Sequence, residues 1–343
     1  MAFLDILEPP RPDAGPVIRQ IETAFDGLRR SFLLRQSLEM DIFERMGGGK
    51  SAELISAELG TDVVMTRLFC DALVSYGLLV RSNGDYANSP WADAYLVRSS
   101  PYCFRQSLER SLAEIDGWHD LGSILRNGPR IIERSQFFND LWIRSIAAMA
   151  LCGSVQKVTA EVSEAIDLSS VRKMLDIGGG HGLYSIAFSA RNPNMDVYVL
   201  DLPDMAPVAK EYISLYGADK VQVMAGDFTK DDIGSGYDLI FSSFNPSGSE
   251  AGMISVLKDA LVPGGWLVVR QFTDKARNDP LANLGWNLVS LDGDRRPRRR
   301  FSGPNTISID EYNSALVESG FKPVRRWAVD EMSDITVMQN QGD

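Results

Sequence analysis

The sequence predicts an α/β fold: a mostly parallel β-sheet covered by helices on both faces, preceded by a mostly helical domain. After Leu168, short β-rich apolar runs alternate with helical stretches, which is typical of βα units and a parallel sheet. Before that point, apolar residues recur at steps of three and four, which is helix spacing. We therefore expect a helical domain over residues 1–110, connector helices over 111–168 and the sheet domain over 169–343.

The front domain has the outline of a winged helix. Apolar spacing predicts a long helix over 17–46 and two shorter helices over 50–55 and 63–76. The turn at 82–85 separates two short extended runs, which predicts a β-hairpin. The last helix offers only Arg67 as a cation, whereas a DNA-reading helix needs several phosphate and base contacts. We therefore favour packing or dimerisation over DNA binding.

Composition excludes several function classes. The chain has 35 Lys and Arg against 46 Asp and Glu, a formal charge of −11, which argues against a nucleic-acid partner. It contains no apolar run of about 18 residues, so no membrane span is expected, and its first residues lack a secretory pattern. The three cysteines form no CxxC pair and only two histidines occur, so we expect no metal site and a cytoplasmic location.

A glycine-rich loop follows the first strand of the sheet domain. Asp176 lies in that strand, and Gly178, Gly180 and Gly182 follow it at every second position. Glycines let the backbone turn sharply and let a ligand approach closely. A dinucleotide-binding fingerprint would need a glycine where Leu183 stands. The loop therefore indicates a ligand site of another kind.

Two further acids end the next two strands. Asp201 ends the second predicted strand, where its carboxylate is placed to accept hydrogen bonds from ribose hydroxyls. Asp227 closes the third strand beside Phe228, whose ring is suited to stacking on adenine. Ligands of parallel sheets bind at the carboxyl ends of the strands. The set predicts a ligand that carries a ribose and an adenine.

With these residues the chain resembles class I (Rossmann-like) S-adenosylmethionine (SAM) methyltransferases. From about Arg19 onward it is similar to the small-molecule O-methyltransferase family typified by caffeate and acetylserotonin enzymes. The landmarks are DIGGGHG at 176–182, VYVLDLP at 197–203, AGDF at 225–228 and LVPGGWLVV at 261–269. The resemblance implies SAM as cofactor, a small-molecule substrate and a homodimer built by the winged-helix-like front domain. The cofactor contacts it implies come from Asp176, Gly178, Gly180, Gly182, Asp201, Leu202, Asp227, Phe228 and Ser242.

The resemblance breaks at the catalytic positions of the family. O-methylating members use a histidine after the fourth strand as a general base, assisted by acids, because a hydroxyl is a poor nucleophile at neutral pH. Here that histidine falls at about Ser243 to Asn245, the acid after the fifth strand falls on Gln271, and a further acid falls near Thr306. None of these side chains is ionisable. The catalytic residues therefore stay unassigned.

Neither histidine of the chain fills the empty position. His181 lies inside the glycine loop, where we expect it to contact the cofactor or the backbone. His119 lies in the connector and is interpreted as a surface or core imidazole.

The empty positions favour a methyl transfer that needs no base. An in-line displacement requires only a lone pair about 3 Å from the methyl group, and a thioether sulfur has that lone pair and no proton to lose. Its product is a sulfonium cation, which aromatic faces stabilise. The candidates for the aromatic wall are Trp142, Phe244 and Trp286. The candidates for binding a substrate carboxylate are Arg144, Arg295 and Arg296.

We therefore predict SAM-dependent S-methylation of a thioether acid such as 4-methylthio-2-hydroxybutyrate. This is the reaction of the methylthiohydroxybutyrate S-methyltransferases of dimethylsulfoniopropionate synthesis, a branch of the family that the chain resembles. Two alternatives stay open. One is O- or N-methylation of an aromatic metabolite, in which water or the acceptor's own acidity removes the proton. The other is a family member that binds SAM and no longer transfers methyl.

Overall fold

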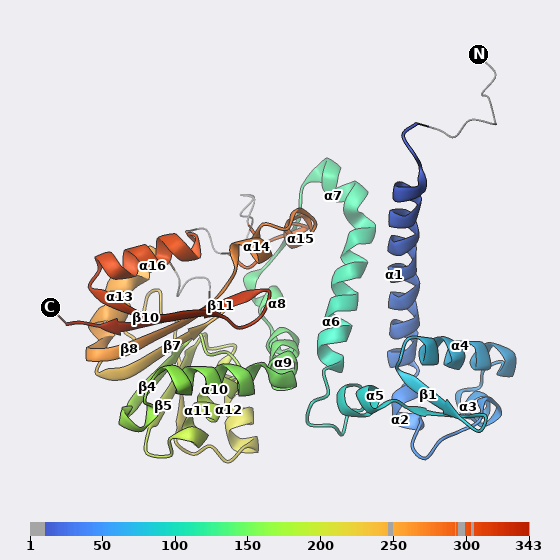
Figure 1. Cartoon of the computed structure of the whole chain (residues 1–343), viewed down its shortest axis with the longest axis horizontal. Coiled ribbons are helices and arrows are strands. Elements are labelled where there is room, and N and C mark those ends of the chain that lie inside the picture. Colours follow the sequence, from blue (N-terminus) through green and yellow to red (C-terminus); the bar gives the residue numbers. More distant parts are fainter. Residues whose placement is uncertain (1–10, 246–249, 292, 294–298, 303–304, 343) are drawn as a thin grey trace. The chain divides into compact units, whose positions relative to one another are not determined.

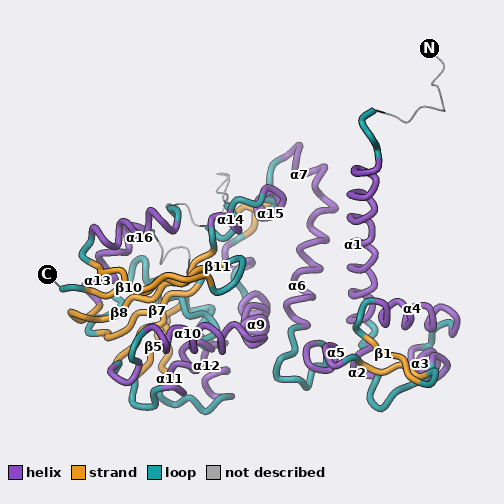
Figure 2. Tube along the Cα trace, in the orientation of Figure 1, coloured by secondary structure: helices purple, strands orange, loops and turns teal. Residues whose placement is uncertain are grey.

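The computed structural model describes residues 11–245, 250–291, 293, 299–302 and 305–342 of the chain. It divides into two compact units, Met1–Arg105 and Gln106–Asp343. Figure 1 follows the chain from one end to the other, and Figure 2 shows where helix gives way to strand. No helix within the described ranges is long and apolar enough to cross a membrane.

The first unit is helical apart from one small hairpin. Its elements are α1 (Gly15–Glu39), α2 (Ile42–Arg45), α3 (Ala52–Leu59), α4 (Val63–Ser75), β1 (Leu79–Ser82), β2 (Asp85–Asn88) and α5 (Pro90–Tyr95). The predicted helix over 17–46 is two helices, because Asp41 adopts a φ of 50° in the left-handed region, which a helix does not tolerate. The predicted hairpin is confirmed. Its turn residues Asn83 and Gly84 have φ of 52° and 92°, as a type I′ turn requires.

The second unit begins with helices that lead into the sheet. They are α6 (Arg105–Asp116), α7 (Leu121–Asn127), α8 (Arg134–Phe137), α9 (Asp140–Met149) and α10 (Val155–Ala165). A kink at Gly153, with a φ of 116°, separates α9 from α10. Between α7 and α8, β3 (Arg130–Ile132) pairs in parallel with β9 (Val289–Leu291). Strands of three residues carry too little periodicity to be predicted from sequence.

The main sheet has seven strands in the order β10-β11-β8-β7-β4-β5-β6. They are β4 (Lys173–Ile177), β5 (Asp196–Asp201), β6 (Val221–Ala225), β7 (Tyr237–Ser243), β8 (Leu261–Phe272), β10 (Phe321–Ala328) and β11 (Ser333–Asn340). Strands β4 to β8 are parallel, and β11 pairs antiparallel with β8, as predicted. The edge strand β10 was not predicted, because it is mostly exposed, carries Pro323 and so lacks the apolar pattern of an inner strand.

Helices cover both faces of this sheet (Figure 1). The helices that cover it include α10, α11 (Leu183–Arg191), α12 (Ala206–Leu215), α13 (Ile254–Ala260) and α16 (Ile309–Glu318), whereas the short helices α14 (Asp274–Arg277) and α15 (Pro280–Trp286) follow the end of β8. On one face, Phe241 and Val268 belong to a buried cluster that includes residues of α10 and α11. On the other face, Ile240 and Val269 belong to a cluster that includes residues of α13 and α16. Burial on both sides explains the nearly continuous apolar strands, and it leaves the carboxyl ends of the strands as the place for a site.

Candidate functional site

The glycine loop at the end of β4 has a backbone that only glycine adopts without strain. Gly178, Gly180 and Gly182 have φ of 66°, 52° and 71°, in the left-handed region. A Cβ atom on Gly178 would lie 2.4 Å from Nδ2 of Asn245, and one on Gly180 would lie 2.7 Å from Cδ1 of Ile143. The loop is therefore a backbone surface that other groups approach without side chains in the way.

Asp176 supports the loop from beneath. Its side chain is 1% exposed, and Oδ2 accepts a hydrogen bond of 2.7 Å from Oγ of Ser185. Burial raises the pKa of Asp176 to about 7, and the Ser185 bond partly opposes this. A Cβ on Gly179 would lie 2.7 Å from Cγ of Asp176. The carboxyl group therefore packs directly against the loop backbone.

Asp201 at the end of β5 joins the loop to the next strand. Its Oδ2 accepts a hydrogen bond of 2.7 Å from the Gly180 amide, and Oδ1 accepts one of 2.7 Å from the Leu202 amide. Burial raises the pKa of Asp201, while the two amides lower it. Because a carboxylate oxygen has two lone pairs, each oxygen keeps one for a further donor. These acceptors suit the two hydroxyls of a ribose.

Asp227 and Phe228 follow β6 at the same edge. The Gly226 amide donates to the carbonyl of Asp201 at 2.9 Å, which ties the end of β6 to the end of β5. The carboxylate of Asp227 accepts hydrogen bonds from Thr229 and from Lys230, and these bonds, chiefly the Lys230 one, lower its pKa to about 2. The ring of Phe228 packs against the sheet core. The carboxylate of Asp227 is therefore engaged by hydrogen bonds within the turn that follows it.

The loop and Asp201 together fit SAM. Ile143 packs against the bare backbone of Gly180, and the half-buried carboxylate of Asp201 lies 3.8 Å from where a Gly180 Cβ would stand. Ser242, which the sequence also predicts as a cofactor contact, is the second-last residue of β7 and is fully buried. The residues present thus supply the acceptors and the open backbone that an adenosine-containing cofactor needs.

The two histidines are not placed as bases. His181 is 4% exposed, and its Nδ1 accepts a hydrogen bond of 3.1 Å from the Leu183 amide. Burial lowers the pKa of His181 to about 4, so the ring is neutral at neutral pH. His119 lies in the exposed turn Gly117–Asp120, where its Nδ1 lies 3.1 Å from the Asp116 carbonyl. His181 therefore shapes the loop, and His119 belongs to the connector.

At the ends of β7 and β8, buried polar atoms stand without partners among the residues the structure describes. Gln271 is 6% exposed, and neither Oε1 nor Nε2 of its amide has a hydrogen bond. The buried hydroxyls of Ser242 and Ser243 also have no hydrogen-bond partner among the described residues. Buried polar groups in proteins are normally paired, so an unpaired group at a ligand-binding edge indicates a ligand. The sequence marked Ser243 and Gln271 only as missing catalytic residues.

An aromatic stack follows β7 and β8. The ring of Phe272 lies 4.0 Å from the ring of Phe244 and 3.8 Å from that of Phe301, centroid to centroid. Phe244 and Phe301 have φ of 54° and 58°, a region that costs a bulky residue about 1–3 kcal/mol. The surrounding structure therefore holds both rings in place at some energetic expense.

The predicted wall residues join one aromatic cluster. Trp286 lies 5.4 Å from Phe301, and Phe137 lies 5.8 Å from Trp286 and 6.3 Å from Trp142. Phe244, however, has Arg270 at 4.2 Å and Phe272 at 4.0 Å, and these two residues lie two apart on one strand, so the ring sits between them. Both faces of the Phe244 ring are therefore covered, so the remaining candidates for the aromatic wall are Trp142 and Trp286.

The sequence missed Arg270, which is buried within the apolar strand β8. Its guanidinium donates hydrogen bonds to Ser154, Tyr184, Asp330 and Ser333. No periodic signal marks one charged residue inside such a run. A buried Arg is satisfied only when several partners converge on it, and these partners come from three separate segments of the chain.

Of the three arginines predicted to bind a substrate carboxylate, the structure describes one. Arg144 donates to Asp140 at 2.7 Å and to Glu211 at 2.5 Å, so two carboxylates already match its charge. Arg295 and Arg296 lie outside the described residues.

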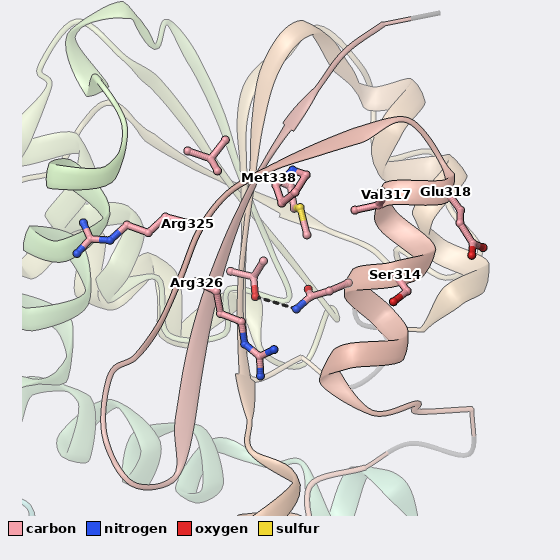
Figure 3. Close-up of a pocket in the computed structure, with 10 residues that line it drawn as sticks. Ser314, Val317, Glu318, Arg325, Arg326 and Met338 are labelled. Carbon is pink, nitrogen blue, oxygen red and sulfur yellow. Dashed lines mark hydrogen bonds between the residues drawn. The ribbon is translucent and has the colours of Figure 1, made fainter.

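A separate groove lies at the outer edge of the sheet, between α16 and the hairpin of β10 and β11 (Figure 3). Ser314, Val317 and Glu318 line it from α16, and Arg325 and Arg326 from β10. In the sheet order, β10 is four strands away from β4. The groove therefore shares no residue with the glycine loop.

Comparison with known proteins identifies both units. The O-methyltransferase domain matches residues 139–303, and the O-methyltransferase dimerisation domain matches residues 23–98. Over 322 residues the chain is 29% identical to the uncharacterized protein MJ0086 of Methanocaldococcus jannaschii, covering 91% of this chain and 86% of that one. It is 26% identical to the N,N-dimethyltransferase OxyT of Streptomyces rimosus, covering 91% and 92%. It is also 26% identical to acetylserotonin O-methyltransferase of Bos taurus, covering 88% and 91%.

Solved structures share the fold. An O-methyltransferase family protein from Burkholderia thailandensis superposes with a TM-score of 0.76 at 18% identity, covering 94% of this chain and 98% of that one. Human N-acetylserotonin methyltransferase in complex with SAM superposes with a TM-score of 0.73 at 19% identity, covering 95% and 98%. The chain therefore belongs to the small-molecule O-methyltransferase family: it is a SAM-dependent methyltransferase with a class I catalytic domain behind a helical dimerisation domain.

Proposed function

We propose that the protein transfers the methyl group of SAM to a small molecule whose accepting atom has no proton to lose. The observation that carries this proposal is the chemistry at the ends of β7 and β8. The family's base is expected at about Ser243 to Asn245 and its acids at about Gln271 and Thr306, and none of these side chains titrates near neutral pH. His181 is neutral and bonded within its loop.

Such a reaction requires the protein to align the acceptor with the cofactor and to exclude water from the two reacting atoms. SAM, when bound, supplies an electrophilic methyl group: the acceptor's lone pair forms the new bond as the carbon–sulfur bond breaks, and its electron pair stays on the departing sulfur. The glycine loop and Asp201 orient the cofactor. The aromatic cluster around Trp142 and Trp286 excludes water from the reacting pair. Positioning and exclusion of water are effective catalytic devices for a transfer of this type.

A thioether sulfur in a small acid, such as 4-methylthio-2-hydroxybutyrate, is the acceptor that we favour. Its product is a sulfonium cation, and the faces of Trp142 and Trp286 provide the quadrupole that stabilises a cation. Such a step fits dimethylsulfoniopropionate synthesis. A carboxylate on the acceptor requires a cationic partner, which Arg144 supplies poorly because Asp140 and Glu211 bind it.

An amine is the second candidate, and a specific observation favours it. This chain is similar over 91% of its own length to OxyT, which is named an N,N-dimethyltransferase. A neutral amine also offers a free lone pair and needs no enzyme base. It differs from a thioether in its dependence on pH, because the protonated amine has no lone pair to give.

The first unit supports a homodimer. Helix α1 carries a row of exposed apolar side chains at helix spacing: Val17, Ile18, Ile21, Phe25, Leu28 and Phe32. A row of this kind is typical of a surface that is covered by a partner, and the dimerisation domain matches residues 23–98. The free cysteines Cys70, Cys103 and Cys152 support the proposal of a reducing cytoplasm.

Competition between acceptors tests the proposal. The purified protein is incubated with SAM, 4-methylthio-2-hydroxybutyrate, catechol and aniline, and mass spectrometry counts each methylated product and S-adenosylhomocysteine. We expect product from the thioether, or from the amine, in preference to the phenol. Exclusive methylation of catechol would contradict base-free transfer.

A further inference from the structure

Arg277, the last residue of α14, is a buried cation that has no anionic partner among the described residues. Its side chain is 3% exposed. Nη1 donates one hydrogen bond of 3.2 Å to the carbonyl of Ile307, and the buried Nε has no partner in the described part of the chain. None of the ion pairs between described residues involves Arg277. A buried charge without a counter-charge is costly, so the arrangement calls for an anion.

Arg277 lies at the edge of the sheet where the methyl acceptor must bind. Helix α14 follows β8 directly, and Arg277 comes six residues after Gln271. Its partner Ile307 belongs to a segment whose Thr306 forms a β-bridge with Glu250, in the connection that follows β7. Arg277 is therefore placed beside the carboxyl ends of β7 and β8, together with the unpaired amide of Gln271.

The described charges around Arg277 do not form an ion pair with it. Arg299 lies within electrostatic range and repels the Arg277 charge. Asp274, at the start of the same short helix, attracts it but forms no ion pair with it, and the Asp274 Oδ1 atom is itself buried without a hydrogen bond among the described residues. Glu311 lies within electrostatic range of Arg299 and is not among the charges that act on Arg277.

We propose that Arg277 anchors a carboxylate of the methyl acceptor through the Nε edge of its guanidinium. With Nη1 engaged by Ile307, the Nε edge is the side left for an anion, and it matches the two oxygens of a carboxylate. The amide of Gln271 supplies a donor or an acceptor for a neighbouring polar group of the same molecule. This inference rests on the proposed function for the identity of the occupant, but its binding is measurable without any methyl transfer.

The first test compares carboxylates with their amides on the full-length protein saturated with S-adenosylhomocysteine. The probes are 4-(methylthio)butanoate and anthranilate, each against its primary amide, and calorimetry measures their dissociation constants. We expect each carboxylate to bind wild type about tenfold more tightly than its amide, the advantage that hydrogen bonds to a charged group confer. Equal binding of acid and amide to wild type would overturn the anchor without any variant.

Substitutions then assign the preference to one residue. Arg277→Gln should abolish the preference for the carboxylates, and Arg277→Lys should keep part of it. Lys275→Gln removes an exposed cation two residues away on the same helix, and it should leave the preference intact. If Arg277→Gln keeps a wild-type preference, or if Lys275→Gln loses it, the anchor is elsewhere.

A wild-type crystal soaked with 4-bromobenzoate gives a readout that does not depend on a variant folding. Bromine's anomalous signal locates the molecule, and we expect its carboxylate within hydrogen-bonding distance of Nε of Arg277. A carboxylate bound at any other cation overturns the proposal. The two proposals fail separately: a carboxylate preference that depends on Arg277, without transfer to a thioether or an amine, would support the anchor and overturn the proposed function.

Discussion

The guanidinium carbon of Arg270 lies 4.2 Å from the centroid of the Phe244 ring, and Phe272 covers that ring at 4.0 Å. The span in which the family's base is expected, about 243–245, thus carries a ring held between a cation and another ring. Arg270 also bonds Ser154 and Tyr184, which links β8 to α11 and to the turn before α10. These contacts fix the position of the Phe244 ring, as a transfer that relies on alignment would require.

Removal of Arg270 should destabilise the protein. Arg270→Ala loses several buried hydrogen bonds and leaves a cavity under Phe244, and we expect a cost of about 2–4 kcal/mol in the free energy of unfolding. Urea unfolding measures it. The control is Arg326→Ala, whose side chain is 41% exposed and pairs with the exposed Asp310 and the more buried Asp334, and we expect it to cost about 1 kcal/mol. Equal effects of the two substitutions would contradict the account.

The glycine loop permits a matched pair of substitutions. Gly180 and Gly217 have similar positive φ, 52° and 60°, so alanine strains both backbones by about 1–2 kcal/mol. Only at Gly180 would the new Cβ collide, at 2.7 Å from Ile143, since nothing lies within 4 Å at Gly217. Gly180→Ala should weaken SAM binding, measured by calorimetry, by at least about tenfold, and Gly217→Ala should leave it unchanged. Unchanged SAM binding in both variants would show that the loop does not contact the cofactor.

Asp201 and Asp227 should differ in their effect on the cofactor. Asp201→Asn exchanges a half-buried acceptor of the Gly180 and Leu202 amides for a group of which one end is a donor, and SAM affinity should fall about tenfold to a hundredfold. Asp227→Asn alters a carboxylate that Thr229 and Lys230 already engage. We expect it to change SAM affinity by less than about threefold. A larger loss at Asp227 would show that its carboxylate contacts the cofactor.

His181 should make stability depend on pH. Burial lowers its pKa to about 4 from the ordinary histidine value of 6.5. Between these values the unfolded chain binds the proton and the folded one does not, so the free energy of unfolding rises with pH through this window. The stability is fully present above pH 6.5 and is lost as pH falls toward 4, by an amount on the order of 3 kcal/mol.

Urea unfolding of wild type and of His181→Asn, from pH 4 to pH 8, measures this term as the difference between the two curves. The difference should rise from pH 4 to about 6.5 and then stay level. His119→Asn is the control, since that ring lies in an exposed turn. A flat difference for His181→Asn would mean that the ring titrates normally in the folded protein.

The sequence predicts the elements whose apolar residues recur periodically and the turns that contain glycine. The βα alternation and the Asn83–Gly84 turn follow from local periodicity and from positive φ. The aromatic cluster does not, because Phe137, Phe272 and Phe301 meet only after β8 and α15 have packed. The burial of Arg277 could not be predicted for the same reason. Its helix has only four residues, which resemble an exposed turn in the sequence, and its burial depends on the distant segment at Ile307.

The most direct test of base-free transfer is the pH dependence of its rate with a thioether acceptor. The turnover number at saturating SAM and 4-methylthio-2-hydroxybutyrate is measured from pH 6 to pH 9, where the acceptor's sulfur and carboxylate do not titrate. We predict a level profile, since no group of the protein has to take up a proton. A rise of about tenfold per pH unit to a plateau, with a midpoint unchanged when 4-(methylthio)butanoate replaces the acceptor, would identify an enzymic base and contradict the account.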